Sequence, residues 1–525
     1  MYKISRRTIS SPVTASLCCS STRPTTAKRA YHYPGFFTSF WLNRHYHNND
    51  EPPTAEKLQS YPIRTSRELR TQKIPPKRSK MLLRDFVDDA LFNPNYGYYS
   101  SATSLLSSPN KQSQMDRENV EDEHYIHYRN RGKVRRQQEQ QQHMPLRYTL
   151  TELFKSLYGH AIAKYMVTEY KLKLYPHKDL IIYEIIGGNG RLMPHILDYI
   201  EKYEPQIYKR TQYTLIELSD RIVSPAFLKD ISTKHHPMVT SLNENIFDWN
   251  TLVTEQCFFL GMEVVNHFAH DVVKYDLDTL QCYQGMICVD EKRNYSEVFT
   301  PLSDPLIAKY LKVQEKVLDY DVQSKKRRLS QLQPNSLASK FYSLFFNSSD
   351  STETTVRHHI HSDNQTNNSN DHTNRNLSLP EYLPTKLFEF LHILSTYFPS
   401  HRLILTDYDK IFTNRRGINA PLIQIPLYND DPWIQTTISD DYLLPPGWFD
   451  ILFPTNFDLL KDIYLTAFNT GTRFQNNVKS MNYSDFLDRY HTSILTDKDK
   501  KNRKKNSKKS HQQFMHSSHI KIFLT

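Results

Sequence analysis

Long apolar runs and paired cysteines are both missing from this chain of 525 residues. No segment approaches the roughly 20 consecutive apolar residues that a membrane-spanning helix needs, so we expect no membrane span. Cys18 and Cys19 lie near the N-terminus, and the other cysteines, Cys257, Cys282 and Cys288, lack the paired spacing of a zinc site or a disulfide framework. We therefore expect reduced, buried thiols and no bound metal.

Acidic side chains are missing from residues 1–49. Seven Lys and Arg residues are scattered there among Ser and Thr, and no apolar core of the signal-peptide type is present. This composition predicts a mitochondrial presequence and N-terminal extension over residues 1–49, with delivery to the mitochondrial matrix. Arg29-Ala30-Tyr31 resembles the site of matrix processing peptidase, which cleaves two residues after an arginine.

Positive charge collects at the two ends of the chain. Of the net charge of +11, residues 1–49 contribute +7 and residues 497–509 contribute +6, so the remainder carries −2. The sequence predicts a basic C-terminal tail over residues 476–525, which could bind phosphates without reading sequence. A solvated tail is the preferred interpretation, and we do not expect a nucleic-acid partner.

Two polar segments interrupt an alternation of helices and strands. Residues 101–147 and 347–378 cannot bury enough apolar surface to offset their ordering entropy, so we predict disordered insertions. Around them, short apolar runs rich in β-branched residues alternate with amphipathic helices. This alternation predicts an α/β fold, a doubly wound and mostly parallel sheet.

The stretch IIYEIIGGNGRLMPHIL, residues 181–197, predicts a strand, a glycine turn and a helix. Gly187, Gly188 and Gly190 would let the backbone approach a ligand, and the helix N-terminus offers unpaired N–H groups. A dinucleotide fingerprint is disfavoured because Met193 stands at its third glycine, and the Gly-Lys-Ser/Thr of a phosphate-binding loop is absent. The turn is either a cradle for another small molecule or a tight turn without a ligand.

Acidic residues occur at the ends of successive predicted strands. Glu184 precedes the glycine turn, Glu217 ends YTLIE, Asp248 follows the apolar step in ENIF, and Glu263 follows CFFLGM. Ligands of open parallel sheets bind at the carboxyl ends of the strands, where an acid can accept both hydroxyls of a ribose. The ordered series predicts a nucleoside-shaped site.

Together these segments resemble the MidA-type mitochondrial methyltransferases over most of residues 80–465. LLRDFVDDALFNPNYGYYS resembles the N-P-x-x-G-Y-Y motif of the family, YEIIGGNGRLM its E-x-G-x-G-x-G loop, and GMEVVNHFAHD its N-E-F-F-D-A-L-P segment. The resemblance implies a class I methyltransferase domain over residues 80–475, with family-specific helical additions and S-adenosyl-L-methionine as cofactor. It further implies symmetric dimethylation of an arginine on a core subunit of respiratory complex I, in support of complex I assembly.

The resemblance also implies roles for individual residues. It assigns cofactor binding to Glu184, Gly187, Gly188, Asn189, Gly190, Glu217 and Asp248. Glu263 would be the catalytic carboxylate that faces the guanidinium, and His270 would either relay a proton or pack in the core. At the catalytic aspartate of the family stands Asn266, which cannot act as a base, and Ile186 replaces the first glycine of the loop.

Two other interpretations stay open from the sequence. One is a catalytically silent assembly factor that keeps the methyltransferase fold and works through its surface, which the change at Asn266 would favour. The other is a mitochondrial nucleic-acid methyltransferase or binding protein that uses the basic tail.

The acid-free segment leads to a first prediction, that the protein is cleaved near Tyr31 on import into the matrix. N-terminal sequencing of protein purified from mitochondria should find a mature end close to that residue. An intact Met1 on the mitochondrial protein would contradict the prediction.

Overall fold

The structure is a computed structural model. It describes residues 60–100, 156–186, 192–217, 234–235, 238–242, 244–318, 376–411, 413, 415–427, 435–439, 441–467, 478–491 and 519–525. These residues belong to one compact unit, Pro53–Thr525. The predicted presequence, the predicted insertion at 101–147 and nearly all of that at 347–378 lie outside the described residues. Among the helices of the described residues, none is long and apolar enough to cross a membrane.

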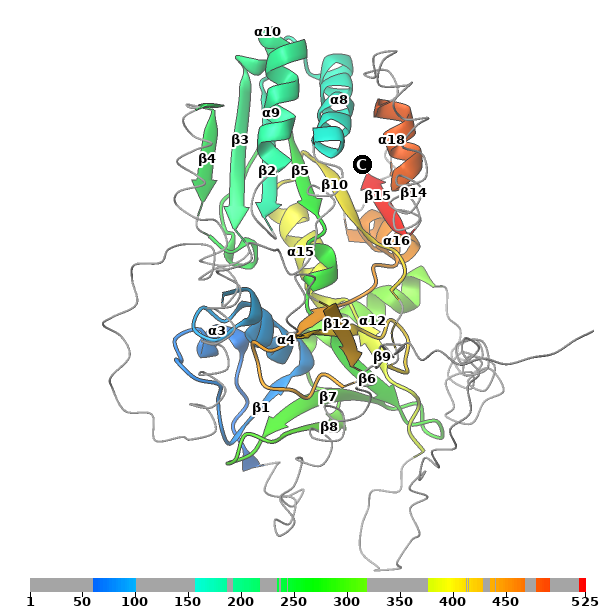
Figure 1. Ribbon diagram of the computed structural model, residues 1–525. Helices are drawn as coiled ribbons and strands as arrows, with labels where there is room; N and C mark the ends of the chain where they lie inside the picture. Colours follow the sequence, from blue (N-terminus) through cyan, green and yellow to red (C-terminus); the bar gives the residue numbers. More distant parts are fainter. Residues whose placement is uncertain are drawn as a thin grey trace, which may run out of the picture. The chain divides into compact units, whose positions relative to one another are not determined.

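A seven-stranded sheet forms the first half of the architecture (Figure 1). Its strands, in spatial order, are β14 (Lys479–Asn482), β15 (Ile520–Leu524), β10 (His401–Tyr408), β5 (Cys257–Met262), β2 (Leu180–Ile186), β3 (Thr211–Glu217) and β4 (Val239–Leu242). The pairs from β10 to β4 are parallel, whereas β15 runs antiparallel to both of its neighbours. The apolar, β-branched runs that predicted buried strands form the centre of this sheet.

Helices pack on both faces of this sheet, because successive side chains of a strand point to opposite faces. From β2, Ile182 belongs to one hydrophobic core and Ile185 to the other. The helices of the first core are α8 (Ser156–Lys173), α9 (Leu192–Tyr203) and α18 (Tyr483–His491). Those of the second core are α12 (Pro305–Val317), α15 (Thr385–Tyr397) and α16 (Phe457–Ala467). The predicted α/β class is confirmed.

Antiparallel strands build the second half. One sheet contains β1 (Ser79–Leu82), β7 (Cys282–Val289), β6 (Asp271–Tyr275), β9 (Glu381–Leu383) and β8 (Tyr295–Pro301). Another contains β12 (Gln435–Ser439), β11 (Leu422–Leu427) and β13 (Asp450–Leu452). Helix α4 (Leu83–Phe92) buries its apolar face in a third core with both sheets. Helical additions were expected from the resemblance, but this region consists mainly of strands.

Four short elements complete the described fold: α3 (Ser66–Leu69), α10 (Pro205–Tyr208), η1 (Ile246–Asp248) and η2 (Val265–His267). At the C-terminus, the structure differs from the predicted tail at residues 476–525. Strands β14 and β15 and helix α18 belong to the main sheet and its first core. The apolar segment IKIFL was overlooked because the charged run before it dominates the composition.

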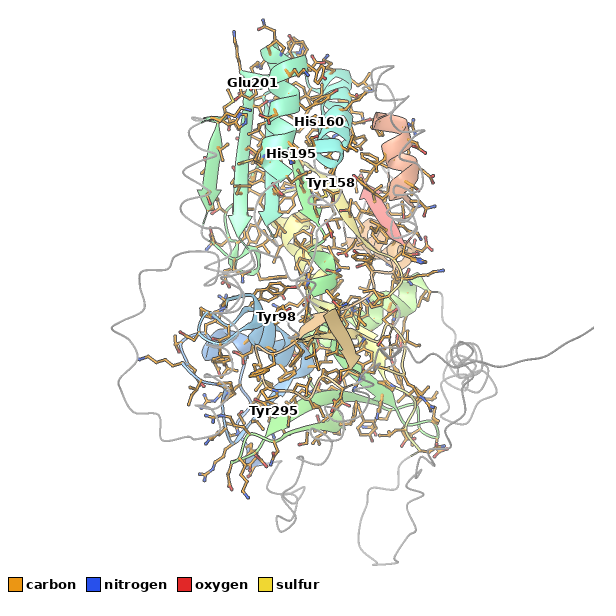
Figure 2. The ribbon with its side chains drawn as sticks, in the orientation of Figure 1. Tyr98, Tyr158, His160, His195, Glu201 and Tyr295 are labelled. Atoms are coloured by element: carbon orange, nitrogen blue, oxygen red, sulfur yellow. The ribbon has the colours of Figure 1, made fainter. Side chains whose placement is uncertain are left out.

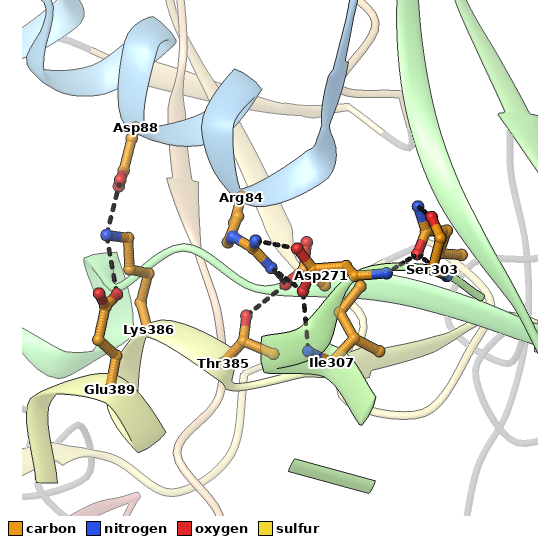
Figure 3. A network of polar contacts seen from close by, with 10 residues as sticks. Arg84, Asp88, Asp271, Ser303, Ile307, Thr385, Lys386 and Glu389 are labelled. Atoms are coloured by element: carbon orange, nitrogen blue, oxygen red, sulfur yellow. Dashed lines mark hydrogen bonds and ion pairs between the residues drawn. The ribbon is translucent and has the colours of Figure 1, made fainter. Parts of the chain in front are cut away.

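Arg84 of α4 joins the two halves through two carboxylates, of which Asp271 is fully buried and Asp304 is partly buried (Figure 3). Its Nη1 donates to Asp271 Oδ2 at 2.6 Å, and its Nη2 donates to Asp304 Oδ2 at 2.6 Å. Asp304 also caps α12, where its Oδ1 accepts from the N–H of Ile307, and Thr385 of α15 donates to Asp271 at 2.6 Å. Although burial alone would lower the pKa of Arg84, the two aspartates raise it, so the guanidinium stays charged.

Replacement of Arg84 with Ala should therefore strongly destabilise the fold. It leaves the fully buried Asp271 without its cation, and breaking a buried ion pair typically costs about 3–5 kcal/mol. Arg64→Ala is the matched control, because its pair with Glu68 is about half exposed and should contribute less than about 1 kcal/mol. Denaturant unfolding of both variants tests this, and similar losses in the two would contradict it.

Candidate active site

Most of the predicted site residues follow the carboxyl ends of parallel strands. Strands β2, β3, β4, β5 and β10 run in the same direction, so their carboxyl ends share one edge of the sheet (Figure 1). The turn with Gly187, Gly188, Asn189 and Gly190 lies outside the described residues, as do the side chains of Ile186 and Glu217. Their assigned roles remain predictions.

Glu184 is buried inside β2, with 4% of its surface exposed. Tyr213 of β3 donates a hydrogen bond to its Oε2 at 2.7 Å. Burial raises the pKa of Glu184 to about 7, only partly offset by this hydrogen bond. A carboxyl group that is easily protonated therefore lies three residues before the turn.

Asp248 lies in η1, not at the end of a strand. The strand before it, β4, ends at Leu242, and Asn245 starts η1 by accepting a hydrogen bond from the N–H of Phe247 at 2.9 Å. The Asp248 carboxylate forms ion pairs with Arg67 and with Arg70, the latter at 3.1 Å. The α3 segment thus covers the carboxylate that the sequence assigned to the cofactor.

Glu263 directly follows β5 in a left-handed backbone conformation, with a φ of 56°. Its N–H donates to the carbonyl of Thr406 at 2.8 Å, which anchors it to β10. The Tyr158 hydroxyl lies 2.7 Å from Thr406 Oγ1. Burial is the largest cause that raises the pKa of Tyr158, and the negative charge of Glu263 is the second. The N-terminal end of α8, where Figure 2 labels Tyr158, therefore reaches the same edge. No pattern in the sequence separates Tyr158 from a packed aromatic residue.

Asn266 of η2 is fully buried and held through its backbone. Its N–H donates to Asp407 Oδ2 at 2.7 Å, and its carbonyl accepts from the N–H of Phe453 at 2.8 Å. Its side-chain Nδ2 and Oδ1 have no hydrogen-bond partner within the described part of the chain. Because an unpaired buried amide is costly, this side chain is well suited to contact a ligand.

His270 has the surroundings of a packed residue, which is the second of the roles left open by the sequence. Its ring stacks on Phe453 with centroids 4.0 Å apart, and its Nδ1 lies 2.9 Å from the carbonyl oxygen of Phe268. Burial lowers its pKa to about 3, so the imidazole is neutral.

A pocket of about 390 Å³ lies among η1, η2, α3, α4 and α15, and we call it the acid-lined pocket. Its carboxylates are those of Asp85, Asp88, Asp89, Asp248 and Glu389, and its cations are Arg67, Arg70 and Lys386. Phe92, Phe247, Phe268 and His267 are also in its wall. Glu263 is not among its lining residues. The sequence did not reveal this pocket, because its walls are far apart along the chain.

Carboxylates outnumber cations in the acid-lined pocket, and burial makes their charge costly. Lys386 lies 3.0 Å from Glu389 and 3.6 Å from Asp88 (Figure 3). Burial raises the pKa of Asp85 and Asp88, and it raises that of Asp89 to about 7. A cation that entered the pocket would therefore be favoured electrostatically.

Asp198, Glu201 and His235 form a group of possible metal ligands outside this site, with ligand atoms within 4.8 Å of one another. Asp198 Oδ1 already lies 3.2 Å from His235 Nε2 and pairs with Lys234. A metal ion would have to compete with this ammonium group for the same oxygen.

Comparisons with known proteins identify relatives. The profile of a family described as "Putative S-adenosyl-L-methionine-dependent methyltransferase" matches residues 161–473. The "Protein arginine methyltransferase NDUFAF7 homolog, mitochondrial" of Schizosaccharomyces pombe is 26% identical over 410 residues, covering 74% of this chain and 76% of that protein. Two solved structures from Burkholderia thailandensis are similar, an uncharacterized protein (10% identity, TM-score 0.47) and a "likely methyl transferase" bound to S-adenosyl-homocysteine (12%, 0.48). Both matches cover 90% of this chain and 94% of the solved one.

The buried carboxyl of Glu184 predicts a pH-dependent stability. Between the usual pKa of 4.5 and the folded value of about 7, the folded state binds the extra proton, so the free energy of unfolding falls as pH rises. Glu184→Gln keeps an acceptor for Tyr213 and removes the titration. Relative to wild type, the variant should gain about 3 kcal/mol between pH 4.5 and pH 8.

Urea unfolding at several pH values measures this difference. The exposed Glu255→Gln is the control and should differ from wild type by the same amount at every pH. A constant difference for Glu184→Gln as well would contradict the prediction.

Proposed function

The chain belongs to the MidA-type family of S-adenosyl-L-methionine-dependent methyltransferases, and on this basis we propose that it methylates an arginine of a protein in the mitochondrial matrix. Its cofactor is S-adenosyl-L-methionine. The relative that is named a mitochondrial protein arginine methyltransferase supports both the substrate class and the organelle. The strand order, with β15 reversed and helices on both faces, supports the doubly wound class I arrangement.

The described residues at the carboxyl edge fit this cofactor. Asn266 offers a buried donor and acceptor that have no partner among the described residues, whereas Asp248 would have to exchange its ion pairs with Arg67 and Arg70 for the cofactor. In the proposal, Glu217 accepts the ribose hydroxyls and the turn at 187–191 cradles the amino-acid part. When bound, the cofactor supplies a methyl group on a positively charged sulfur.

The acid-lined pocket is the observation that supports an arginine as the substrate. A guanidinium is a planar cation with five N–H donors, and it pairs best with carboxylates. Asp88 and Glu389 both pair with Lys386, and burial raises the pKa of Asp85 and of Asp88. An incoming guanidinium would add the positive charge that these groups lack.

Alignment accounts for most of the proposed catalysis. Holding two reactants in line can lower a barrier by roughly 7–11 kcal/mol in favourable cases. Phe92, Phe247 and Phe268 in the pocket wall would exclude water from the guanidinium. We propose that Glu263, at the end of β5, orients the reacting nitrogen where the pocket meets the carboxyl edge.

The more specific part of the proposed function, the product and the substrate protein, rests on the family resemblance. It implies symmetric dimethylation of an arginine on a complex I core subunit, and so a role in complex I assembly. A second candidate is a catalytically silent assembly factor, which the asparagine at position 266 favours because it cannot take a proton. The two candidates differ in whether a methyl group is transferred.

Label transfer from S-adenosyl-L-methionine to complex I core subunits distinguishes the candidates. Wild-type protein should place label on arginine, recovered as symmetric dimethylarginine, and Glu263→Gln should lower kcat by about 100-fold. The exposed Glu255→Gln should match wild type.

Calorimetry with the cofactor accompanies this assay. A wild-type protein that binds the cofactor but labels no arginine would contradict the proposed activity and favour the silent assembly factor. A normal kcat for Glu263→Gln would remove Glu263 from the mechanism.

A further inference from the structure

Three side chains from distant segments meet at one wall of the acid-lined pocket. His267 lies in η2, Tyr99 follows α4, and Asp450 starts β13. The Tyr99 hydroxyl lies 2.6 Å from His267 Nε2 and donates to Asp450 Oδ1 at 3.0 Å. The same Asp450 oxygen is 3.6 Å from His267 Nε2. His267 itself lines the pocket.

The hydrogen bonds determine which ring nitrogen carries the hydrogen. A tyrosine hydroxyl has one hydrogen, and Tyr99 gives it to Asp450. The contact between Tyr99 and His267 Nε2 therefore needs a hydrogen on Nε2. His267 Nδ1 keeps its lone pair, and it forms no hydrogen bond to any residue that the structure describes. In this tautomer the lone pair on Nδ1 is the basic position of His267, a residue of the pocket wall.

The surroundings hold this imidazole in place. Tyr99 stacks on Phe92 with centroids 5.5 Å apart, and it meets the His267 ring edge-on at 88°. The backbone of η2 is fixed from two sides at Asn266, by Asp407 and by Phe453. A base with fixed orientation needs little reorganisation when it accepts a proton.

We propose that His267 accepts the proton that the substrate nitrogen loses on methylation, with Tyr99 and Asp450 as positioning residues. The proposal rests on the proposed function and adds a residue to it. The substrate nitrogen forms a bond to the methyl carbon while the carbon–sulfur bond breaks and its electron pair stays on sulfur. The proton on that nitrogen moves to His267 Nδ1, and Tyr99 and Asp450 stabilise the imidazolium that forms.

Other groups near the pocket are less suited to this role. The Tyr96 hydroxyl lies 2.8 Å from both oxygens of Asp89, and one of these oxygens also accepts from Asn93. His270 Nδ1 is hydrogen-bonded to the carbonyl oxygen of Phe268, and the ring is buried against Phe453. Glu263 is absent from the pocket wall that His267 lines, so we do not assign the proton transfer to it, and its proposed role stays at the end of β5.

Steady-state kinetics of His267→Ala with an arginine-containing complex I subunit tests the proposal. The variant should lower kcat by about 100-fold or more, while KM changes by less than about threefold, because the base acts in the chemical step. Added imidazole should restore part of kcat, since a free base can occupy the space that the side chain leaves. Tyr99→Phe keeps the ring stack and should lower kcat less than His267→Ala does.

The exposed His392→Ala is the matched control and should match wild type with and without imidazole. A kcat for His267→Ala within about threefold of wild type would overturn the proposal, as would a loss that imidazole does not reverse. If His267→Ala does not fold, the kcat of Tyr99→Phe tests the proposal instead. An unchanged kcat for Tyr99→Phe would then overturn the proposal. Absence of label with wild-type protein would instead overturn the proposed function.

Discussion

Parallel pairing of β2, β3, β4, β5 and β10 is the constraint on which the site depends. Because these strands run in one direction, every segment that leaves them does so at the same edge. The glycine turn, η1 and η2 all begin there, although more than 70 residues separate the first from the last. Strands β5 and β10 are parallel neighbours, so Glu263 after β5 and Asp407 in β10 lie at the same edge. The Asp407 carboxylate accepts a hydrogen bond from the backbone N–H of Asn266 and so anchors η2.

The antiparallel half turns this edge into a pocket. Helices α3 and α4 and the start of α15 form the walls opposite η1 and η2. Arg84 holds α4 against β6 and α12 through the buried Asp271 and the partly buried Asp304, so the wall has a rigid attachment. The carboxylates on the pocket side of α4 lack such a dedicated partner, since Lys386 serves both Asp88 and Glu389. On one side of α4, Arg84 is fully paired with carboxylates and stabilises the fold. On the pocket side, the negative charge of the carboxylates is only partly neutralised, which would favour a bound cation.

The sequence predicted the parts of the fold that depend on local pattern. Short apolar runs identified β2, β3 and β5, and the helical spacing after the glycines identified α9. Asp248 was expected at a strand end but lies in η1, because the apolar step IF resembles the start of a strand. The antiparallel strands and β15 were not predicted, since β1, β9 and β13 are short and β15 follows a charged run. His267, Tyr99 and Asp450 could not be grouped from the sequence, because only tertiary packing brings positions 99, 267 and 450 together.

In our proposal, one edge of the sheet holds the cofactor while the acid-lined pocket holds an arginine. A crystal structure with S-adenosyl-homocysteine and an arginine-containing peptide tests this most directly. We expect the adenosyl group near Asp248, with the guanidinium between the carboxylates of α4 and within hydrogen-bonding reach of His267 Nδ1. A cofactor bound away from this edge, or a peptide whose arginine stays outside the pocket, would contradict it.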